Sequence, residues 1–209
     1  MRLSGVLARI ESRGSVLPGV EAQSRMAPVP RHGWPPGVDA VDARLAAGLL
    51  LVFPVAGEAT LLLTKRSDAL AKHSGQVSLP GGAVDEDETI EEAALREAFE
   101  EVALDRASVR LLGRLTPVPI AVSGFVLHPV MGTTAERPPV RPASNEVDRI
   151  IEVPLAELAD PLRHRRTTRA RDGFEFEMPY FDVGGEQVWG ATAMVLAEFI
   201  ALLGVVPAP

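Results

Sequence analysis

The sequence predicts an α/β fold, an α/β/α sandwich around a mixed β-sheet. Several segments have the patterns typical of strands, either continuous apolar runs or alternation of apolar and polar residues. Two long segments with helical periodicity separate them. The chain has 209 residues, which suits one domain of ordinary size with an additional arm. We therefore divide it into a short N-terminal helix with a Pro/Gly-rich arm (1–43), a main domain (44–203) and a C-terminal tail (204–209).

Composition excludes several classes of function. The net charge of −7 argues against general nucleic-acid binding. No apolar run reaches the length of about 18 residues that predicts a membrane-spanning helix. The absence of cysteine excludes disulfides, thiolate metal sites and a cysteine nucleophile. The first residues lack the apolar core of a signal peptide, so a cytoplasmic location is expected.

A short amphipathic helix is predicted over residues 2–12, where apolar residues recur at helical spacing. We expect it to dock on the main domain; a membrane-surface helix is the alternative, but its basic face is thin. Residues 14–43 are rich in glycine and proline and are expected to form a mostly extended arm. Trp34 in this arm is interpreted as a packing anchor, with a lid as the alternative.

The main domain begins with a predicted β-hairpin. Residues 45–55 form a continuous apolar run, typical of a buried strand, and Gly57-Glu58 supplies a turn into a partner strand at 59–65. Further extended segments are predicted at residues 108–119, 125–134, 147–153, 174–181 and 187–191. Pro129 suggests that its strand lies at an edge or carries a bulge. The remaining predicted segments are a Pro-rich loop (136–145), a short helix or turn (154–159) and a buried C-terminal helix (192–203).

The predicted helix that begins after Thr89 carries closely spaced carboxylates. Glu97, Glu100 and Glu101 are three or four residues apart or adjacent, so a helix directs them the same way. Carboxylates crowded in this way repel one another unless a cation lies among them, and oxygen-only clusters suit Mg²⁺ or Mn²⁺. The alternative is an ordinary solvated acidic face, which we prefer for Glu91 and Glu92.

The surrounding residues position this helix. Thr89 and Glu92 form a capping box that fixes its start. Steps of 100° per residue place an apolar face opposite the three glutamates, made by Leu95, Ala98, Phe99 and Val102. Arg96 can pair with Glu100 at i, i+4. Upstream, Pro80-Gly81-Gly82 is a turn whose glycines let the backbone approach a ligand closely.

These positions match a known pattern. Gly82, Glu88, Arg96, Glu97, Glu100 and Glu101 fit the Nudix box, G-x5-E-x7-R-E-U-x-E-E-x-G-U, so the chain resembles the Nudix hydrolases. The resemblance implies the Nudix fold and hydrolysis of a diphosphate with Mg²⁺ or Mn²⁺ held by Glu97, Glu100 and Glu101. It implies Arg96, Glu97 and Glu100 as catalytic residues, with Glu100 favoured to accept the proton of the attacking water.

One position departs from the box. Its final glycine is Ala103 here, close to the predicted end of the helix, where a left-handed residue is favoured. An alanine there costs about 1 kcal/mol if its φ must be positive. The departure affects how the helix ends and leaves the carboxylate cluster intact.

A second pattern narrows the substrate. Residues 61–82, LLLTKRSDALAKHSGQVSLPGG, are similar to the motif LLTxRSxxLRxHxGQVxFPGG that precedes the Nudix box in coenzyme A diphosphatases. Ala71 and Leu79 replace the arginine and phenylalanine of that motif. The resemblance implies cleavage of coenzyme A (CoA) into 3′,5′-ADP and 4′-phosphopantetheine. The candidate substrate-binding residues are Lys65, Arg66, Lys72, His73, Gln76, Gly81 and Gly82.

Recognition of CoA requires a cation for its 3′-phosphate. Ala71 cannot supply one, so Lys72 or a downstream basic stretch is a candidate, with a solvated basic loop as the alternative for that stretch. The arginines concerned are Arg163, Arg165, Arg166 and Arg169. Glu146 is interpreted either as a remote metal ligand or base or as a surface carboxylate. Arg66 is expected to clamp a phosphate with two hydrogen bonds.

Three functions remain open from the sequence. The first is a CoA diphosphatase, and the second is a Nudix hydrolase of another small molecule such as ADP-ribose or a dinucleotide. The third is a nucleotide-sensing module without catalysis, which is expected to lose box carboxylates that this chain retains. The preferred form of CoA stays open, as does homodimerisation, because residues 14–43 can contact a second subunit or cover their own domain.

Overall fold

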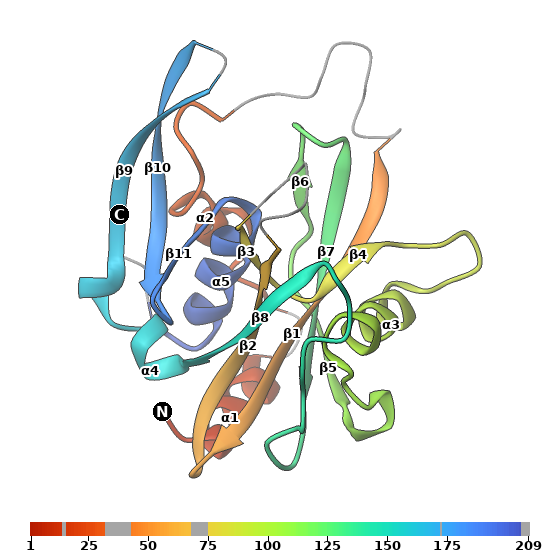
Figure 1. The fold of residues 1–209 in the computed structure, drawn as a ribbon. Coiled ribbons are helices and arrows are strands. Elements are labelled where there is room, and N and C mark those ends of the chain that lie inside the picture. Colours follow the sequence, from red (N-terminus) through yellow and green to blue (C-terminus); the bar gives the residue numbers. More distant parts are fainter. Residues whose placement is uncertain (14–15, 32–42, 68–74, 172, 206–209) are drawn as a thin grey trace.

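The computed structural model describes residues 1–13, 16–31, 43–67, 75–171 and 173–205 (Figure 1). Its helices are α1 (Leu3–Arg13), α2 (Gly19–Ser24), α3 (Ile90–Val102), α4 (Leu155–Leu158) and α5 (Gly190–Leu202). Its first strands are β1 (Arg44–Val55), β2 (Glu58–Arg66), β3 (Val77–Ser78), β4 (Gly81–Ala83), β5 (Arg110–Arg114) and β6 (Val118–Ile120). The remaining strands are β7 (Phe125–Thr133), β8 (Val147–Pro154), β9 (His164–Arg171), β10 (Phe174–Val183) and β11 (Glu186–Trp189). Short 3₁₀ turns cover Arg106–Ser108 and Pro161–Arg163.

The strands form two sheets. The main sheet has the order β3-β2-β1-β7-β5, with β4, β6 and β8 paired to β1, β7 and β2. It is mixed because β1 runs parallel to β7, while the other pairs are antiparallel. A separate antiparallel sheet has the order β11-β10-β9. The α/β sandwich around a mixed sheet predicted from the sequence is therefore confirmed, and a small second sheet is added to it.

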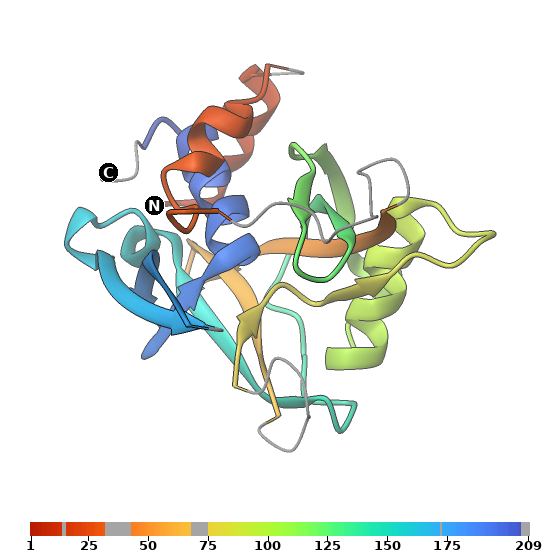
Figure 2. The ribbon, with the colours of Figure 1, turned by 90° about the horizontal axis from the view of Figure 1, so that it is seen from above.

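Each face of the main sheet has its own apolar core. Alternation along β1 sends Leu49, Leu51 and Phe53 toward α3 and places Leu50 in the core that includes α5. Seen from above, α3 lies on one side of the sheet and α1, α2 and α5 lie on the other (Figure 2). The continuous apolar run at 45–55 is thus explained by burial on both faces.

Most predicted elements are confirmed, including α1, the β1–β2 hairpin, β8, α4 and α5. The prediction of an extended arm is wrong for residues 19–24, which form α2. This helix is held by contacts distant in sequence: Gln23 Nε2 donates to the carbonyl oxygen of Thr116 at 2.8 Å and to Glu198 Oε2 at 2.8 Å. Trp34 lies outside the described residues.

Three further predictions are corrected. The predicted strand at 108–119 is interrupted between β5 and β6, and the extended segment at 187–191 ends at Trp189 because Gly190 begins α5. The edge prediction for Pro129 is wrong, since β7 lies between β1 and β5. Pro129 instead lies opposite the gap between β5 and β6, where its carbonyl oxygen accepts a hydrogen bond from Leu115 N at 3.0 Å. The nitrogen of Pro129 points to the same side, so the N–H that proline lacks would also have faced this gap.

The basic stretch at 163–171 is mostly strand β9 rather than a loop. It pairs along its length with β10, and β10 pairs with β11 at its far end. In the described part of the chain, no helix is long and apolar enough to cross a membrane.

Candidate active site

The Gly-rich turn upstream of α3 is pressed against its neighbours. Strand β4 pairs with β1, and a Cβ at Gly81 would overlap the carbonyl oxygen of Ala47. A Cβ at Gly82 would overlap the carboxylate of Glu97. Both glycines therefore have a structural role: Gly81 lets β4 lie directly against β1, and Gly82 lets it lie directly against α3.

Both ends of α3 are built as its sequence indicates. The Thr89–Glu92 capping box is present, with Glu92 N donating to Thr89 Oγ1 at 3.2 Å and Thr89 N donating to Glu92 Oε2 at 2.9 Å. At the other end, Ala103 adopts the left-handed conformation, with φ 55° and ψ 32°. The predicted positive φ is therefore confirmed. The helix ends in the left-handed conformation that the glycine of the Nudix box would adopt, but an alanine is strained in it.

The predicted faces of α3 need correction. Phe99 is turned outward, with 51% of its surface exposed, and the Arg106 guanidinium lies 5.1 Å from its ring centre. Glu101, predicted on the exposed side, is buried. The core-facing positions Ala94 and Ala98 have no side chain beyond Cβ, so the helix lies close to the sheet. Glu101 is three residues from Ala98 and shares this buried face, whereas Phe99 lies about 140° around the helix from Ala94 and points away from it.

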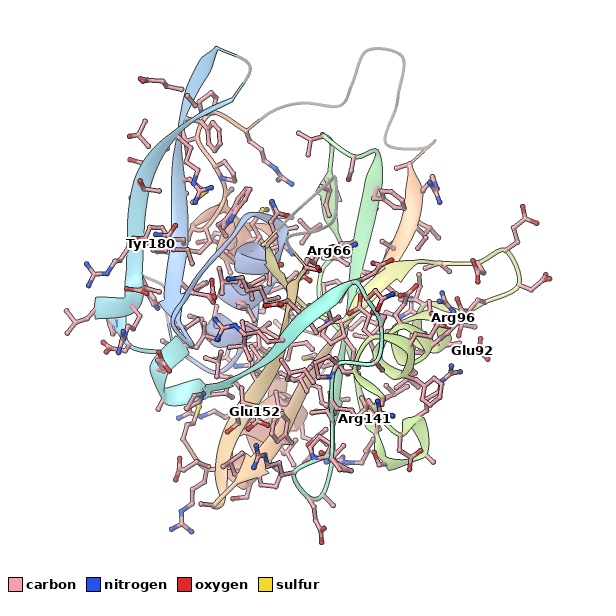
Figure 3. The ribbon with its side chains drawn as sticks, viewed as in Figure 1. Arg66, Glu92, Arg96, Arg141, Glu152 and Tyr180 are labelled. Atoms are coloured by element: carbon pink, nitrogen blue, oxygen red, sulfur yellow. The ribbon has the colours of Figure 1, made fainter. Side chains whose placement is uncertain are left out.

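Arg96 connects the acidic loop to the helix (Figure 3). It donates from Nε and Nη2 to both carboxylate oxygens of Glu88, at 2.9 and 3.0 Å, and from Nη2 to the Ala83 carbonyl oxygen at 3.0 Å. Its Nη1 donates to Glu97 Oε1 at 2.8 Å and to Glu100 Oε2 at 3.4 Å. The predicted pairing with Glu100 is present but is the longest of these bonds. Arg96 mainly fixes Glu88 and Glu97.

Two glutamates of α3 are buried where an ionised carboxylate is unfavourable. Burial, together with the nearby charge of Glu97, raises the pKa of Glu101 to about 8. Burial also raises the pKa of Glu97, although hydrogen bonds from Arg96 oppose the shift. An ionised carboxylate at Glu101 is therefore disfavoured unless a cation lies beside it.

Arg66 and Glu146 complete this cluster. Arg66 Nη2 donates to Glu146 Oε2 at 2.7 Å. The charge of Arg66 opposes the rise in the pKa of Glu101, and the charge of Glu146 adds to it, so both lie near Glu101. Arg66 Nε and Glu101 Oε2 are buried without a hydrogen-bond partner among the described residues. Within the described part of the chain, the site thus holds a buried carboxylate oxygen and a buried guanidinium N–H without partners, on two residues whose charges interact.

These residues fit a divalent cation by their chemistry. All candidate donors are carboxylate oxygens, as Mg²⁺ and Mn²⁺ prefer, and the buried Glu101 Oε2 has no hydrogen-bond partner in the part of the chain that the structure describes. Within the described ranges, no three His, Asp or Glu side chains lie close enough together to hold a metal ion as they stand. Arg96 instead holds Glu97 and Glu100.

The predicted substrate-binding residues Lys65 and Arg66 point to different faces of the sheet. Arg66 reaches Glu146, but its neighbour Lys65 donates from Nζ to Glu186 Oε1 at 2.9 Å, on β11. The Gln76 carbonyl oxygen accepts from Arg66 N at 2.9 Å, which places β3 beside the site. Lys72, His73 and Ala71 lie outside the described residues.

The arginines of β9 are engaged within their own sheet. Arg165 Nε lies 3.5 Å from Asp182 Oδ2, and Arg166 pairs with Glu177. The Arg169 guanidinium lies 5.3 Å from the centre of a Trp189 ring and donates to Gln187 Oε1 at 3.2 Å. These contacts weaken the suggestion that this stretch binds a phosphate.

Two charged residues near Lys65 were missed by sequence reasoning. Arg149 on β8 lies directly opposite Lys65 on β2, and Glu186 accepts hydrogen bonds from both. No local pattern marks Arg149 or Glu186, because their meeting depends on strand register and on the return of β11 toward β2.

Comparison with known proteins identifies the family. The model of the NUDIX domain matches residues 42–172. The chain belongs to the Nudix hydrolase family. It is 41% identical over 157 residues to the uncharacterized Nudix hydrolase NudL of Cronobacter sakazakii, covering 72% of this chain and 78% of that protein. The NudL of Shigella flexneri is 40% identical over 154 residues, covering 70% and 77%.

A solved structure supports the fold of this Nudix hydrolase. The RenU Nudix hydrolase of M. smegmatis superimposes with a TM-score of 0.57 at 23% identity, covering 80% of this chain and 89% of RenU. As a Nudix hydrolase, the protein acts on a diphosphate in a small nucleotide-type molecule. Members of the family generally use divalent metal ions.

Proposed function

We propose that this Nudix hydrolase cleaves the diphosphate of CoA or its derivatives, giving 3′,5′-ADP and 4′-phosphopantetheine or its acyl form. The observation that carries the proposal is the pair of unsatisfied buried atoms, Glu101 Oε2 and Arg66 Nε. A diphosphate bound to Mg²⁺ or Mn²⁺ offers a cation to the first atom and an anionic oxygen to the second. The substrate assignment within the family rests on the similarity of residues 61–82 to the CoA diphosphatase motif.

The glutamates of α3 have distinct surroundings that suit distinct roles. Glu97 and Glu101 are withdrawn from solvent and would hold the metal ion, with Glu100 at its solvent side. When bound, such an ion neutralises phosphate charge and lowers the pKa of a coordinated water. The side chain of Glu100 is 52% exposed, and among the described residues its ion pair is the 3.4 Å contact with Arg96, so it is available to accept the proton of the attacking water.

The remaining residues position these groups and the substrate. Arg96 is a positioning residue, since it orients Glu97 through a 2.8 Å hydrogen bond and ties it to Glu88. Arg66 would turn from Glu146 to the diphosphate, which satisfies Arg66 Nε. Further contacts to the substrate are assigned to Lys72, His73, Gln76, Gly81 and Gly82, around the turn that precedes α3.

The deciding experiment is a product assay. The wild type and Glu100→Gln are incubated with CoA, dephospho-CoA and ADP-ribose, each with Mg²⁺ or Mn²⁺, and Glu136→Gln in an exposed loop serves as the control. We expect 3′,5′-ADP from CoA with the wild type and the control, and a loss of at least about 100-fold in Glu100→Gln, the scale of general-base catalysis. Faster cleavage of ADP-ribose with little CoA turnover contradicts the CoA assignment.

A second candidate function is hydrolysis of ADP-ribose or a dinucleotide. It is favoured by one observation, the replacement of the motif arginine by Ala71, which removes a cation from the region expected to recognise CoA. The same assay separates the two functions, because only CoA carries both the pantetheine arm and the 3′-phosphate.

A further inference from the structure

A second charged cluster lies on the other face of β2. Lys65 and Arg149 are directly opposite in the antiparallel β2–β8 ladder. Side chains at such positions share a face and lie about 5 Å apart at Cβ, so two cations there repel each other. Glu186 of β11 lies between them, accepting from Lys65 Nζ at 2.9 Å and from Arg149 Nη2.

The cluster of Lys65, Arg149 and Glu186 has positive charge and N–H donors available for an anion. One carboxylate faces two cations, which leaves a net charge of +1. A lysine has three N–H donors and an arginine has five, more than one carboxylate can accept. The side chain of Glu186 is 17% exposed and that of Lys65 is 24% exposed, whereas that of Arg149 is 49% exposed. Arg149 is therefore the group that a dissolved ligand meets first, with Lys65 beneath it.

The cluster adjoins the proposed diphosphate site. Lys65 is followed directly by Arg66, and Arg66 pairs with Val147 one rung beyond the Lys65–Arg149 pair. Arg66 also contacts Glu146, which precedes Val147. The two cationic positions thus lie at the same end of β2 and β8 but on opposite faces of the sheet. A ligand bound at Arg66 therefore reaches Lys65 and Arg149 only by passing around this end of the strand.

We propose that Lys65 and Arg149 form a second anion subsite, which takes the phosphomonoester on the ribose of the substrate. Glu186 is its positioning residue, because it holds the two repelling cations together. This inference rests on the proposed function and deepens it. The subsite supplies the cation that Ala71 does not, because Lys65 and Arg149 share one carboxylate, whereas Arg165 and Arg166 each have an acidic partner of their own.

The test compares two ligands that differ only in this phosphate. Binding of 3′,5′-ADP and of 5′-AMP to the full chain is measured by calorimetry with Mg²⁺ present. We expect the wild type to bind 3′,5′-ADP about tenfold or more tightly than 5′-AMP, the scale of a charge-assisted contact. Lys65→Ala and Arg149→Ala should lose this preference and keep their affinity for 5′-AMP, which also shows that each variant is folded.

Two further variants sharpen the result. Arg149→Lys keeps the charge and should retain part of the preference. Arg137→Ala removes another exposed arginine, which pairs with Glu152 of the same strand β8 at 3.0 Å, and should retain all of it. The inference is overturned if the wild type binds the two ligands equally or binds neither, or if Lys65→Ala and Arg149→Ala both keep the preference.

The outcomes also separate this inference from the proposed function. A preference for 3′,5′-ADP that depends on Arg149, in a protein that does not cleave CoA, supports the subsite and contradicts the CoA diphosphatase proposal. Cleavage of CoA by a protein whose preference is insensitive to Lys65 and Arg149 supports the proposed function and overturns the subsite.

Discussion

At the scale of single residues, Glu101 is the clearest case of an ionisable side chain whose charged form is disfavoured by burial. Because burial raises its pKa, the folded protein without a cation is destabilised by this carboxylate at neutral and alkaline pH. We expect Glu101→Gln to raise the free energy of unfolding in EDTA at pH 8 by roughly 1–3 kcal/mol, while activity is lost. Thermal unfolding of both proteins in EDTA is the measurement, and Glu136→Gln should change little. A lower melting temperature for Glu101→Gln would contradict this prediction and would mean that Arg66 and the backbone N–H of Gly81 outweigh the cost of burying the carboxylate.

Ala103 carries strain of a different kind, in the backbone. Its φ of 55° is the left-handed conformation that a glycine adopts without steric penalty. Ala103→Gly should therefore raise the free energy of unfolding by about 0.5–1 kcal/mol and the melting temperature by about 1–4 °C, without changing activity. Ala135→Gly is the matched control, in an exposed loop where φ is not positive, and should be neutral or slightly destabilising. Equal effects of the two substitutions would mean that the conformation of Ala103 carries no strain.

At the scale of elements, a single buried carboxylate attaches α2 to the domain. Glu198 of α5 accepts from Gly19 N at 3.1 Å, from Gln23 Nε2 at 2.8 Å and from Thr116 Oγ1 at 2.7 Å. Thr116 N donates to both of its oxygens at 3.2 Å. In Glu198→Gln the side-chain amide faces a donor in either orientation. We expect a loss of about 2–4 kcal/mol in the free energy of unfolding and faster proteolysis near α2.

The matched control for this prediction is Glu21→Gln, an exposed glutamate on α2 itself. Its melting temperature and its rate of proteolysis should equal those of the wild type. If Glu198→Gln melts at the wild-type temperature, the buried network does not hold α2, and the apolar contacts of Ala22 and Met26 do so instead.

The elements also show which features the sequence could predict. Hydrophobic patterning was sufficient for the presence of β1, β2, α3 and α5. It failed for α2, whose partner Glu198 lies 175 residues from Gln23, and for the buried face of α3, which is centred on Ala94, Ala98 and Glu101 and leaves Phe99 exposed. It also misplaced Pro129, since the gap between β5 and β6 that accommodates a proline is a tertiary feature.

At the scale of the whole molecule, the main sheet divides the charged residues between two faces. The box glutamates were predictable because their spacing along one helix is local information. Lys65 and Arg66 were grouped by their adjacency in sequence, whereas the strand directs one toward Glu186 and the other toward Glu146. Arg149 joins Lys65 only through the β2–β8 register, which the sequence does not specify.

The whole molecule should respond to the divalent cation that its α3 site is proposed to bind. An ion that binds only the folded state stabilises it by about 2.7 kcal/mol at 100 times its dissociation constant, a rise of about 5–10 °C in melting temperature. We expect this rise for the wild type with Mg²⁺ or Mn²⁺ and for Glu136→Gln, and a much smaller one for Glu97→Gln and Glu101→Gln. Glu101→Gln should thus begin more stable than the wild type in EDTA and gain less from metal. An equal rise in all four proteins would place the stabilising ion elsewhere on the molecule, and the role proposed for Glu97 and Glu101 would have to be abandoned.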